Sequence, residues 1–197
     1  MIGTFYNKNS LKDTLMINIS DSQPVNFKEE QKYSMGFDEK NNICFINIFN
    51  FSKYLESKEG FIKYSFEINN IVNRICNIDL SEHINDNDFI VAEVVECEPI
   101  EGTHLHKCKV FNGINTLDIV CGAKNVRRQL KVVLAQVGAI LPNGLKINKG
   151  KLLNYNSFGM LCSKKELNID SEDFNDSGII ELDSNYQVGQ KFDKIFA

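Results

Sequence analysis

FIVAEVVECEPI, residues 89–100, is the first of four apolar runs that decide the fold of the second half of the chain. The other three are HKCKVF (106–111), TLDIVC (116–121) and KVVLAQVGAIL (131–141). Apolar and polar side chains alternate in these runs, which is typical of β-strands with one buried face. The dipeptide Asn112-Gly113, between the second and third runs, is a strong signal for a hairpin turn. The runs therefore predict successive antiparallel strands.

Two later runs extend this pattern. SFGMLCS (157–163) predicts a fifth strand and SGIIEL (177–182) a final short one, after a strong turn signal at Pro142-Asn143-Gly144. Five or more short strands within about 100 residues favour a small closed or nearly closed β-barrel. The alternation predicts that the following side chains are mainly buried: Ile90, Ala92, Val94, Val110, Ile119, Val133 and Leu161.

The first part of the chain has a different pattern. DTLMINIS (13–20) and NNICFINIF (41–49) are typical of strands, and INNIVNRIC (68–76) has apolar residues at the spacing of one helical face. The polar segment LSEHINDND (80–88) predicts a domain boundary. We therefore expect a mainly β protein with α+β content. A small α+β domain of unknown role at 1–85 would precede a C-terminal β-barrel domain at 86–197.

Length and composition limit the class of protein. The 197 residues are 43% hydrophobic and 24% charged, which excludes a disordered chain, a collagen-like fibre and a coiled coil. No run approaches the roughly 18–20 apolar residues of a membrane span, and the N-terminus does not resemble a signal peptide. We therefore expect a cytoplasmic protein without membrane association. Its six scattered cysteines fit reduced, buried thiols better than a disulfide framework.

Charge is segregated along the second part, although the net charge is only −4. The segment from Lys124 to Lys165 holds nine cations and no Asp or Glu, whereas its flanks, 86–123 and 166–197, together hold four cations and fifteen acids. Lysine and arginine bind phosphates, and nearby carboxylates would repel them. The acid-free segment thus favours nucleic-acid binding over a generic mixed surface.

Evidence for catalysis is weak. His104, His106 and Cys108 alternate along one predicted strand, and Cys121 could lie on the next, but this spacing matches no standard zinc module. The chain has no GxxxxGK[ST], GxGxxG or GxSxG motif. We expect a non-catalytic protein without metal or cofactor, with His104 and His106 on an exposed or loop-adjacent surface. An enzyme built on this histidine face or on residues 1–85 remains an alternative.

Two motifs, VCGAKNV (120–126) and SFGMLCSKKEL (157–167), carry a family resemblance. They and the residues around them resemble the tRNA-binding OB-fold domain, which is EMAP II-like and is found near the N-terminus of the phenylalanyl-tRNA synthetase β chain. The resemblance covers about 88–190, and FINIFNFS (45–52) looks like a segment of YtpR-like proteins, so the whole chain resembles that group. One departure is EPIEGTHLHKC (98–108), which lacks the polar centre of the family's usual turn.

The resemblance implies an OB-fold β-barrel that holds tRNA, or another structured RNA, on a basic face. With the charge pattern, it gives these candidate RNA-binding residues: Lys124, Asn125, Arg127, Arg128, Lys131, Lys146, Lys149, Lys151, Ser157, Met160, Ser163, Lys164 and Lys165. We expect reversal of Arg127, Arg128 and Lys131 to weaken RNA binding without changing stability. Relatives of this OB-fold often pair, so a homodimer is also expected. The alternative is a peptide- or protein-binding module similar to an export chaperone of the same fold.

Overall fold

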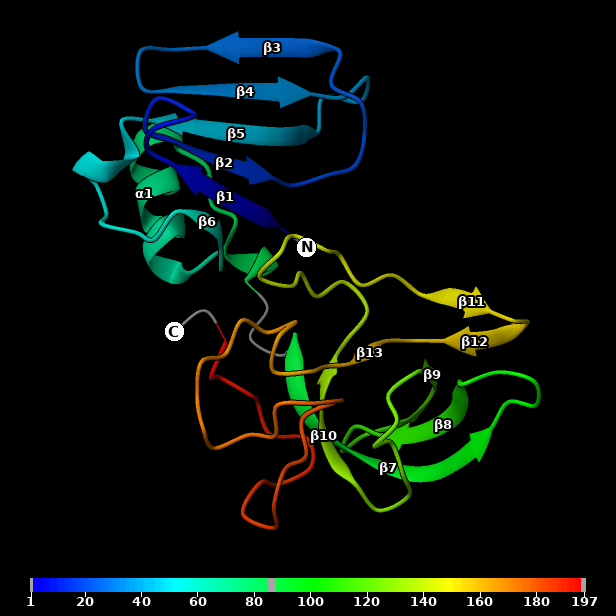
Figure 1. Ribbon diagram of the computed structural model, residues 1–197. Helices are drawn as coiled ribbons and strands as arrows, with labels where there is room; N and C mark the ends of the chain where they lie inside the picture. The colour runs from blue at the N-terminus through cyan, green and yellow to red at the C-terminus, as the bar shows by residue number, and fades with distance from the viewer. Residues whose placement is uncertain (1, 85–87, 196–197) are drawn as a thin grey trace. The chain divides into compact units, whose positions relative to one another are not determined.

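The computed structural model describes residues 2–84 and 88–195 (Figure 1). Contacts along the chain separate two compact units, Met1–Asn85 and Asp86–Ala197. The boundary predicted at 80–88 includes residues 85–87, which lie outside the described residues. Each unit is described by itself below. No helix among the described residues is long and apolar enough to cross a membrane.

The first unit is a six-stranded antiparallel sheet in the order β3-β4-β5-β2-β1-β6, with the helix α1 packed on one face (Figure 1). The predicted strands at 13–20 and 41–49 and the predicted helix at 68–76 are all present. The strands are β1 (Gly3–Asn7), β2 (Thr14–Asn18), β3 (Asn26–Glu29), β4 (Tyr33–Phe37), β5 (Ile43–Phe49) and β6 (Gly60–Ile62). The helices are α1 (Phe66–Cys76) and the 3-10 turns η1 (Phe51–Lys53) and η2 (Ser81–His83).

Local sequence explains the helix. The side chain of Ser65 caps its first turn by accepting a hydrogen bond from the backbone N–H of Ile68. Asn77, in the left-handed region at φ 56°, ends it. Ile68 and Val72 are buried on one helical face, as the spacing predicted, and they pack against alternating strand residues of the sheet.

The second unit is a curled five-stranded antiparallel sheet in the order β13-β10-β7-β8-β9. Its strands are β7 (Phe89–Pro99), β8 (His106–Phe111), β9 (Thr116–Cys121), β10 (Lys131–Ala135) and β13 (Met160–Leu161), and a separate hairpin pairs β11 (Gly150–Leu152) with β12 (Tyr155–Ser157). The sheet curls enough for the backbone N–H of Phe158 to donate to the carbonyl of Asp118 at 2.8 Å. A mainly β protein with an OB-like sheet is thereby confirmed.

The predicted core of this unit is also confirmed. Each of the seven predicted core residues is buried, with the highest exposed fraction, 5%, at Leu161. Burying one aliphatic side chain contributes about 1.5–3 kcal/mol. Six of the seven lie in one apolar cluster, whereas Val133 lies in a second cluster with Phe89 and Val91, so β7 and β10 bury apolar side chains on both faces.

Three strand boundaries were predicted wrongly. The run 131–141 is a strand only to Ala135, and the chain then turns, with the N–H of Ala139 donating to the carbonyl of Gln136. The run 157–163 is interrupted at Gly159, between β12 and β13. The run 177–182 forms only a single bridge, from Leu182 to Lys131. Ala139, Ile179 and Ile180 are buried all the same, so apolar burial continues where the strand pattern does not.

Candidate nucleic-acid interface

The nine cations of the acid-free segment come from loops and from the hairpin, with one exception. Lys131 lies in β10, and Lys151 in β11, which Figure 1 shows standing out from the curled sheet. Six of the nine are exposed: Lys124, Arg127, Arg128, Lys149, Lys151 and Lys165. Lys131, Lys146 and Lys164 are half-buried. Loops and a projecting hairpin thus carry most of the exposed positive charge.

Three of these cations are held by groups of the protein itself. Arg127 forms a bidentate ion pair with Glu181, at 3.0 and 2.6 Å. Lys131 Nζ donates to the carbonyls of Ser184 and Tyr186, the latter at 2.6 Å. Lys164 pairs with Asp176 and also donates to the carbonyl of Ser171. Acids remote in sequence therefore neutralise part of the segment that is itself acid-free.

Five exposed cations differ from these three. Lys124, Arg128, Lys149, Lys151 and Lys165 make no ion pair with any residue within 2–84 or 88–195. With no carboxylate of the described residues paired to them, they attract solvent ions, which a phosphate can replace with a gain in entropy. They form the candidate phosphate-binding set, called the free cations below.

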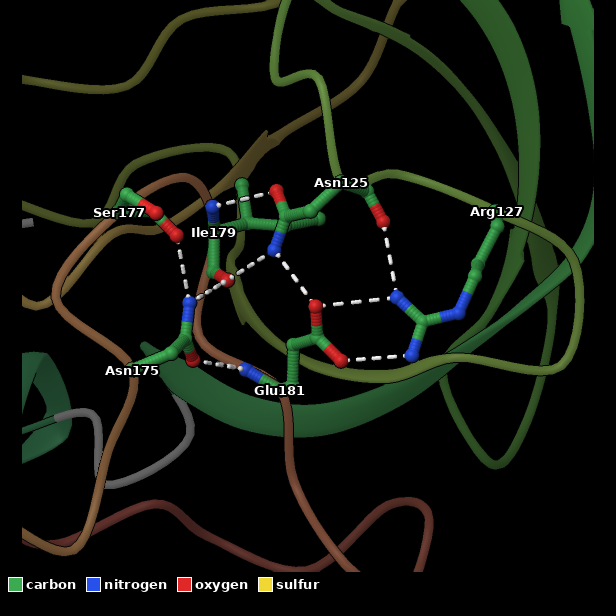
Figure 2. A network of polar contacts seen from close by, with 6 residues as sticks. All are labelled: Asn125, Arg127, Asn175, Ser177, Ile179 and Glu181. Atoms are coloured by element: carbon green, nitrogen blue, oxygen red, sulfur yellow. Dashed lines mark hydrogen bonds and ion pairs between the residues drawn. The ribbon is translucent and has the colours of Figure 1, made fainter.

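Asn125 is part of a structural network rather than a free polar group (Figure 2). Its side chain accepts from the N–H of Ile179 at 3.0 Å and donates to the carbonyl of the same residue at 2.8 Å. It also donates to the carboxylate of Glu181. Arg127 donates both to this carboxylate and to the backbone carbonyl of Asn125. Asn175 completes the network by accepting from the N–H of Glu181. The loop after β9 is thus fastened to residues 175–181.

This network changes one expectation about stability. Reversing Arg127 removes a bidentate ion pair, and reversing Lys131 leaves two carbonyls without their donor. Arg127 and Lys131 are therefore not free surface charges, and we now expect the triple reversal of Arg127, Arg128 and Lys131 to lower stability as well as RNA binding. A test of RNA binding has to use the free cations instead.

The two sequence motifs meet at one pocket of about 360 Å³. Cys121, Gly122 and Ala123 of the first motif line one side, and Met160 and Ser163 of the second line another. Glu166 also lines the pocket. In the sequence, Lys124 directly follows Ala123, and Lys165 directly precedes Glu166. Residues far apart in sequence are thereby brought to one place, with a free cation next to each group.

The two serines of the second motif bind the protein backbone. Ser163 Oγ accepts from the N–H of Glu166, and Glu166 in return accepts from the N–H and hydroxyl of Ser163, which is a capping box. Ser157 Oγ accepts from the N–H of Val120 and donates to the carbonyl of Gly159. Both serines therefore fix the shape of the pocket wall. Met160, half-buried, lines the pocket directly.

The histidine face is distributed between surface and core. His104 is exposed in the loop before β8, whereas His106 is half-buried and its Nδ1 has no hydrogen-bond partner among the described residues. Cys108 and Cys121 are buried. Within the part of the chain that the structure describes, no three His, Cys, Asp or Glu residues are placed to hold a metal ion.

Glu181 gives the network a pH dependence. Its hydrogen bonds from Arg127, and then from Asn125, hold the pKa of this carboxyl below its usual value of 4.5. A carboxyl with a lowered pKa in the folded state stabilises above its unfolded pKa, and that contribution is lost as the pH falls through the folded pKa. Glu181→Gln should therefore melt below the wild type at pH 7.

The difference in melting temperature between Glu181→Gln and the wild type should narrow as the pH drops below about 4.5. Thermal melts of both proteins between neutral and acid pH measure it. Glu172→Gln is a matched control at an exposed position and should show no such narrowing. A constant difference at all pH values would contradict the role given to the ionised Glu181.

The second unit thus combines a curled five-stranded sheet with exposed cations on its loops and hairpin. Residues 89–191 match the family described as "Putative tRNA binding domain". The chain belongs to this tRNA-binding-domain family. The predicted resemblance to YtpR-like proteins and to the phenylalanyl-tRNA synthetase β chain is confirmed.

Three relatives illustrate the match. "Uncharacterized protein MG449" of Mycoplasma genitalium is 37% identical, over 99% of this chain and 89% of its own length. "Putative tRNA-binding protein YtpR" of Bacillus subtilis is 35% identical, over 97% and 99%. "Phenylalanine--tRNA ligase beta subunit" of Ehrlichia ruminantium is 37% identical over 71% of this chain but only 18% of its own length. The similarity to the first two therefore includes both units, and the similarity to the ligase is to a part of it.

Proposed function

We propose that the protein is a non-catalytic RNA-binding protein that holds tRNA on the OB-like unit. The observation that carries this proposal is the set of five free cations, gathered in a domain of the tRNA-binding family. When an exposed lysine with no carboxylate partner binds a phosphate, no existing ion pair has to be broken first. The full-length similarity to a protein named for tRNA binding supports the same partner.

In this proposal the candidate residues have two different roles. Lys124, Arg128, Lys149, Lys151 and Lys165 contact phosphates directly. Met160 lines the pocket between the two motifs, and Lys146 is a half-buried member of the same acid-free segment. The remaining candidates, Asn125, Arg127, Lys131, Ser157, Ser163 and Lys164, hold the loops in place through the contacts described above. Phosphate contacts of this kind position an RNA without reading its bases.

The salt dependence of binding tests the proposal. Each phosphate neutralised changes the slope of log K against log salt by about −0.7 to −0.9, so five contacts predict a slope of roughly −3.5 to −4.5. Titration of unmodified tRNA into the full chain at several salt concentrations measures the slope. An export-chaperone-like module would instead bind an unfolded polypeptide with little salt dependence, and a slope near zero for tRNA would contradict our proposal.

We further propose a cytoplasmic location, a homodimer, and separate domains at 1–85 and 86–197, the first of unknown role. The separate apolar clusters of the two units support the division. A cooperative thermal transition of the isolated 86–197 fragment, and sedimentation of the full chain as a dimer, are the expected results.

A further inference from the structure

Two cysteines face each other across neighbouring strands of the OB-like unit. Cys97 in β7 and Cys108 in β8 are direct register partners, and their Sγ atoms lie 3.8 Å apart. Residues directly opposite in an antiparallel pair have Cα atoms about 4.5–5.5 Å apart, which is within the range of about 4.4–6.8 Å found for disulfides. Both thiols are free in this structure. The backbone therefore already has the separation that a disulfide needs.

The two thiols differ in access. Cys108 is buried, with an exposed fraction of 3%, and burial raises the pKa of its thiol, which keeps it protonated. Cys97 is only partly buried, so it is the more accessible residue of the two. A partly exposed thiol next to a second thiol is the arrangement of a reacting and a resolving cysteine.

We propose that Cys97 and Cys108 are a site of reversible oxidation, at which a peroxide converts the two thiols into a disulfide. The Cys97 thiol loses its proton and attacks one peroxide oxygen; the O–O bond breaks, a sulfenic acid forms and one water leaves after protonation. The Cys108 sulfur then attacks the Cys97 sulfur, the S–O bond breaks, and the hydroxyl leaves with the Cys108 proton as a second water. Two thiols are oxidised and one peroxide is reduced to two waters.

We expect the oxidation to change a contact of the loop that carries Lys124 and Arg128, and its effect on RNA binding rests on the proposed function. In the reduced protein Cys97 Sγ donates to the carbonyl of Val126 at 3.8 Å. Val126 is buried in the loop that carries Lys124 and Arg128. A disulfide removes the Cys97 proton and draws its sulfur towards Cys108, so this contact is lost. We expect the oxidised protein to bind tRNA several-fold more weakly.

Mass spectrometry of the full chain tests the oxidation site. The protein is treated with a small excess of hydrogen peroxide, unfolded and alkylated. Four of the six cysteines should then be alkylated, and the mass of the chain without the added alkyl groups should be two hydrogens below that of the reduced chain. Cleavage at Lys and Glu places the two cysteines on separate peptides, which should be found linked. Cys97→Ser should keep its five remaining thiols, whereas Cys121→Ser, which alters the third thiol of the same apolar cluster, should still form the link. Six alkylated cysteines, or a link through Cys121, would overturn the proposal.

Titration of tRNA tests the consequence separately. Binding should weaken on oxidation of the wild type, recover with dithiothreitol, and stay constant in peroxide-treated Cys97→Ser. If the link forms and the affinity is unchanged, the coupling through Val126 is wrong. If the reduced protein does not bind tRNA at all, the proposed function fails, while the mass spectra still decide the oxidation site.

Discussion

Gly159→Ala is expected to lower the free energy of unfolding of the OB-like unit by about 3 kcal/mol. Gly159 has φ +146°, a backbone conformation that residues with a side chain rarely adopt. A Cβ at this position would lie 2.9 Å from the carbonyl oxygen of Ala135 and 2.9 Å from Leu134 Cδ1. The carbonyl belongs to a strand of the sheet and cannot move aside as a flexible side chain could. The methyl group would therefore separate β13 from β10, which it pairs with.

Urea unfolding followed by circular dichroism measures this loss. Gly150→Ala is a matched control in β11, because no atom lies within 4 Å of the Cβ that it adds. The control should change stability by less than about 0.5 kcal/mol. Equal unfolding midpoints for Gly159→Ala and the wild type would show that this close approach of the backbone does not exist in solution.

Reversing Lys124, Arg128 and Lys165 together to Glu is expected to weaken tRNA binding about 10- to 100-fold at about 0.1 M salt and to reduce the steepness of the salt slope by about 2–3. Each of these side chains is exposed and makes no ion pair with a described residue. The substitutions put three negative charges in place of positive ones, and Lys124 and Lys165 each directly adjoin in sequence a residue that lines the pocket. Binding and salt dependence should therefore both fall, whereas the melting temperature should change little.

Lys12, Lys32 and Lys53 in the first unit supply the matched control. They are exposed as well, and their reversal changes the net charge of the chain by the same amount. A general effect of net charge would weaken binding equally in both triple variants. Equal losses would contradict a binding surface on the OB-like unit, as would no loss in either variant.

Strand positions were predicted where aliphatic side chains alternate on the buried face, whereas β1 and β4, which bury Tyr6 and Tyr33, were missed. Leu15 and Ile17 alternate with the exposed Met16, so β2 can be read directly from the sequence. β3 could not be predicted, because all four of its residues, NFKE, are exposed and no alternation results. The end of β10 was missed for the opposite reason. Ala139 and Leu141 are buried after the chain has turned, so their apolar pattern continues past the strand.

The candidate site was predictable as a segment but not as a set of side chains. The absence of acids between Lys124 and Lys165 describes sequence neighbours only. Glu181, the partner of Arg127, lies 54 residues further along the chain. No local signal predicts that pairing, although GIIEL (178–182) was part of a predicted strand. From the sequence, the Asn125 side chain could bind either the loop backbone or a phosphate. In the structure it forms hydrogen bonds with the backbone of Ile179, so it makes a loop contact.

Protection of lysines from acetylation by bound tRNA tests the central claim most directly, because it uses the unmodified full chain. The extent of acetylation of each lysine, with and without saturating tRNA, is measured by mass spectrometry of peptides. We expect tRNA to protect Lys124, Lys149, Lys151 and Lys165 and to leave Lys12, Lys32 and Lys53 unchanged. Unchanged acetylation of the first four lysines at saturating tRNA, or protection confined to the first unit, would contradict the proposed binding surface.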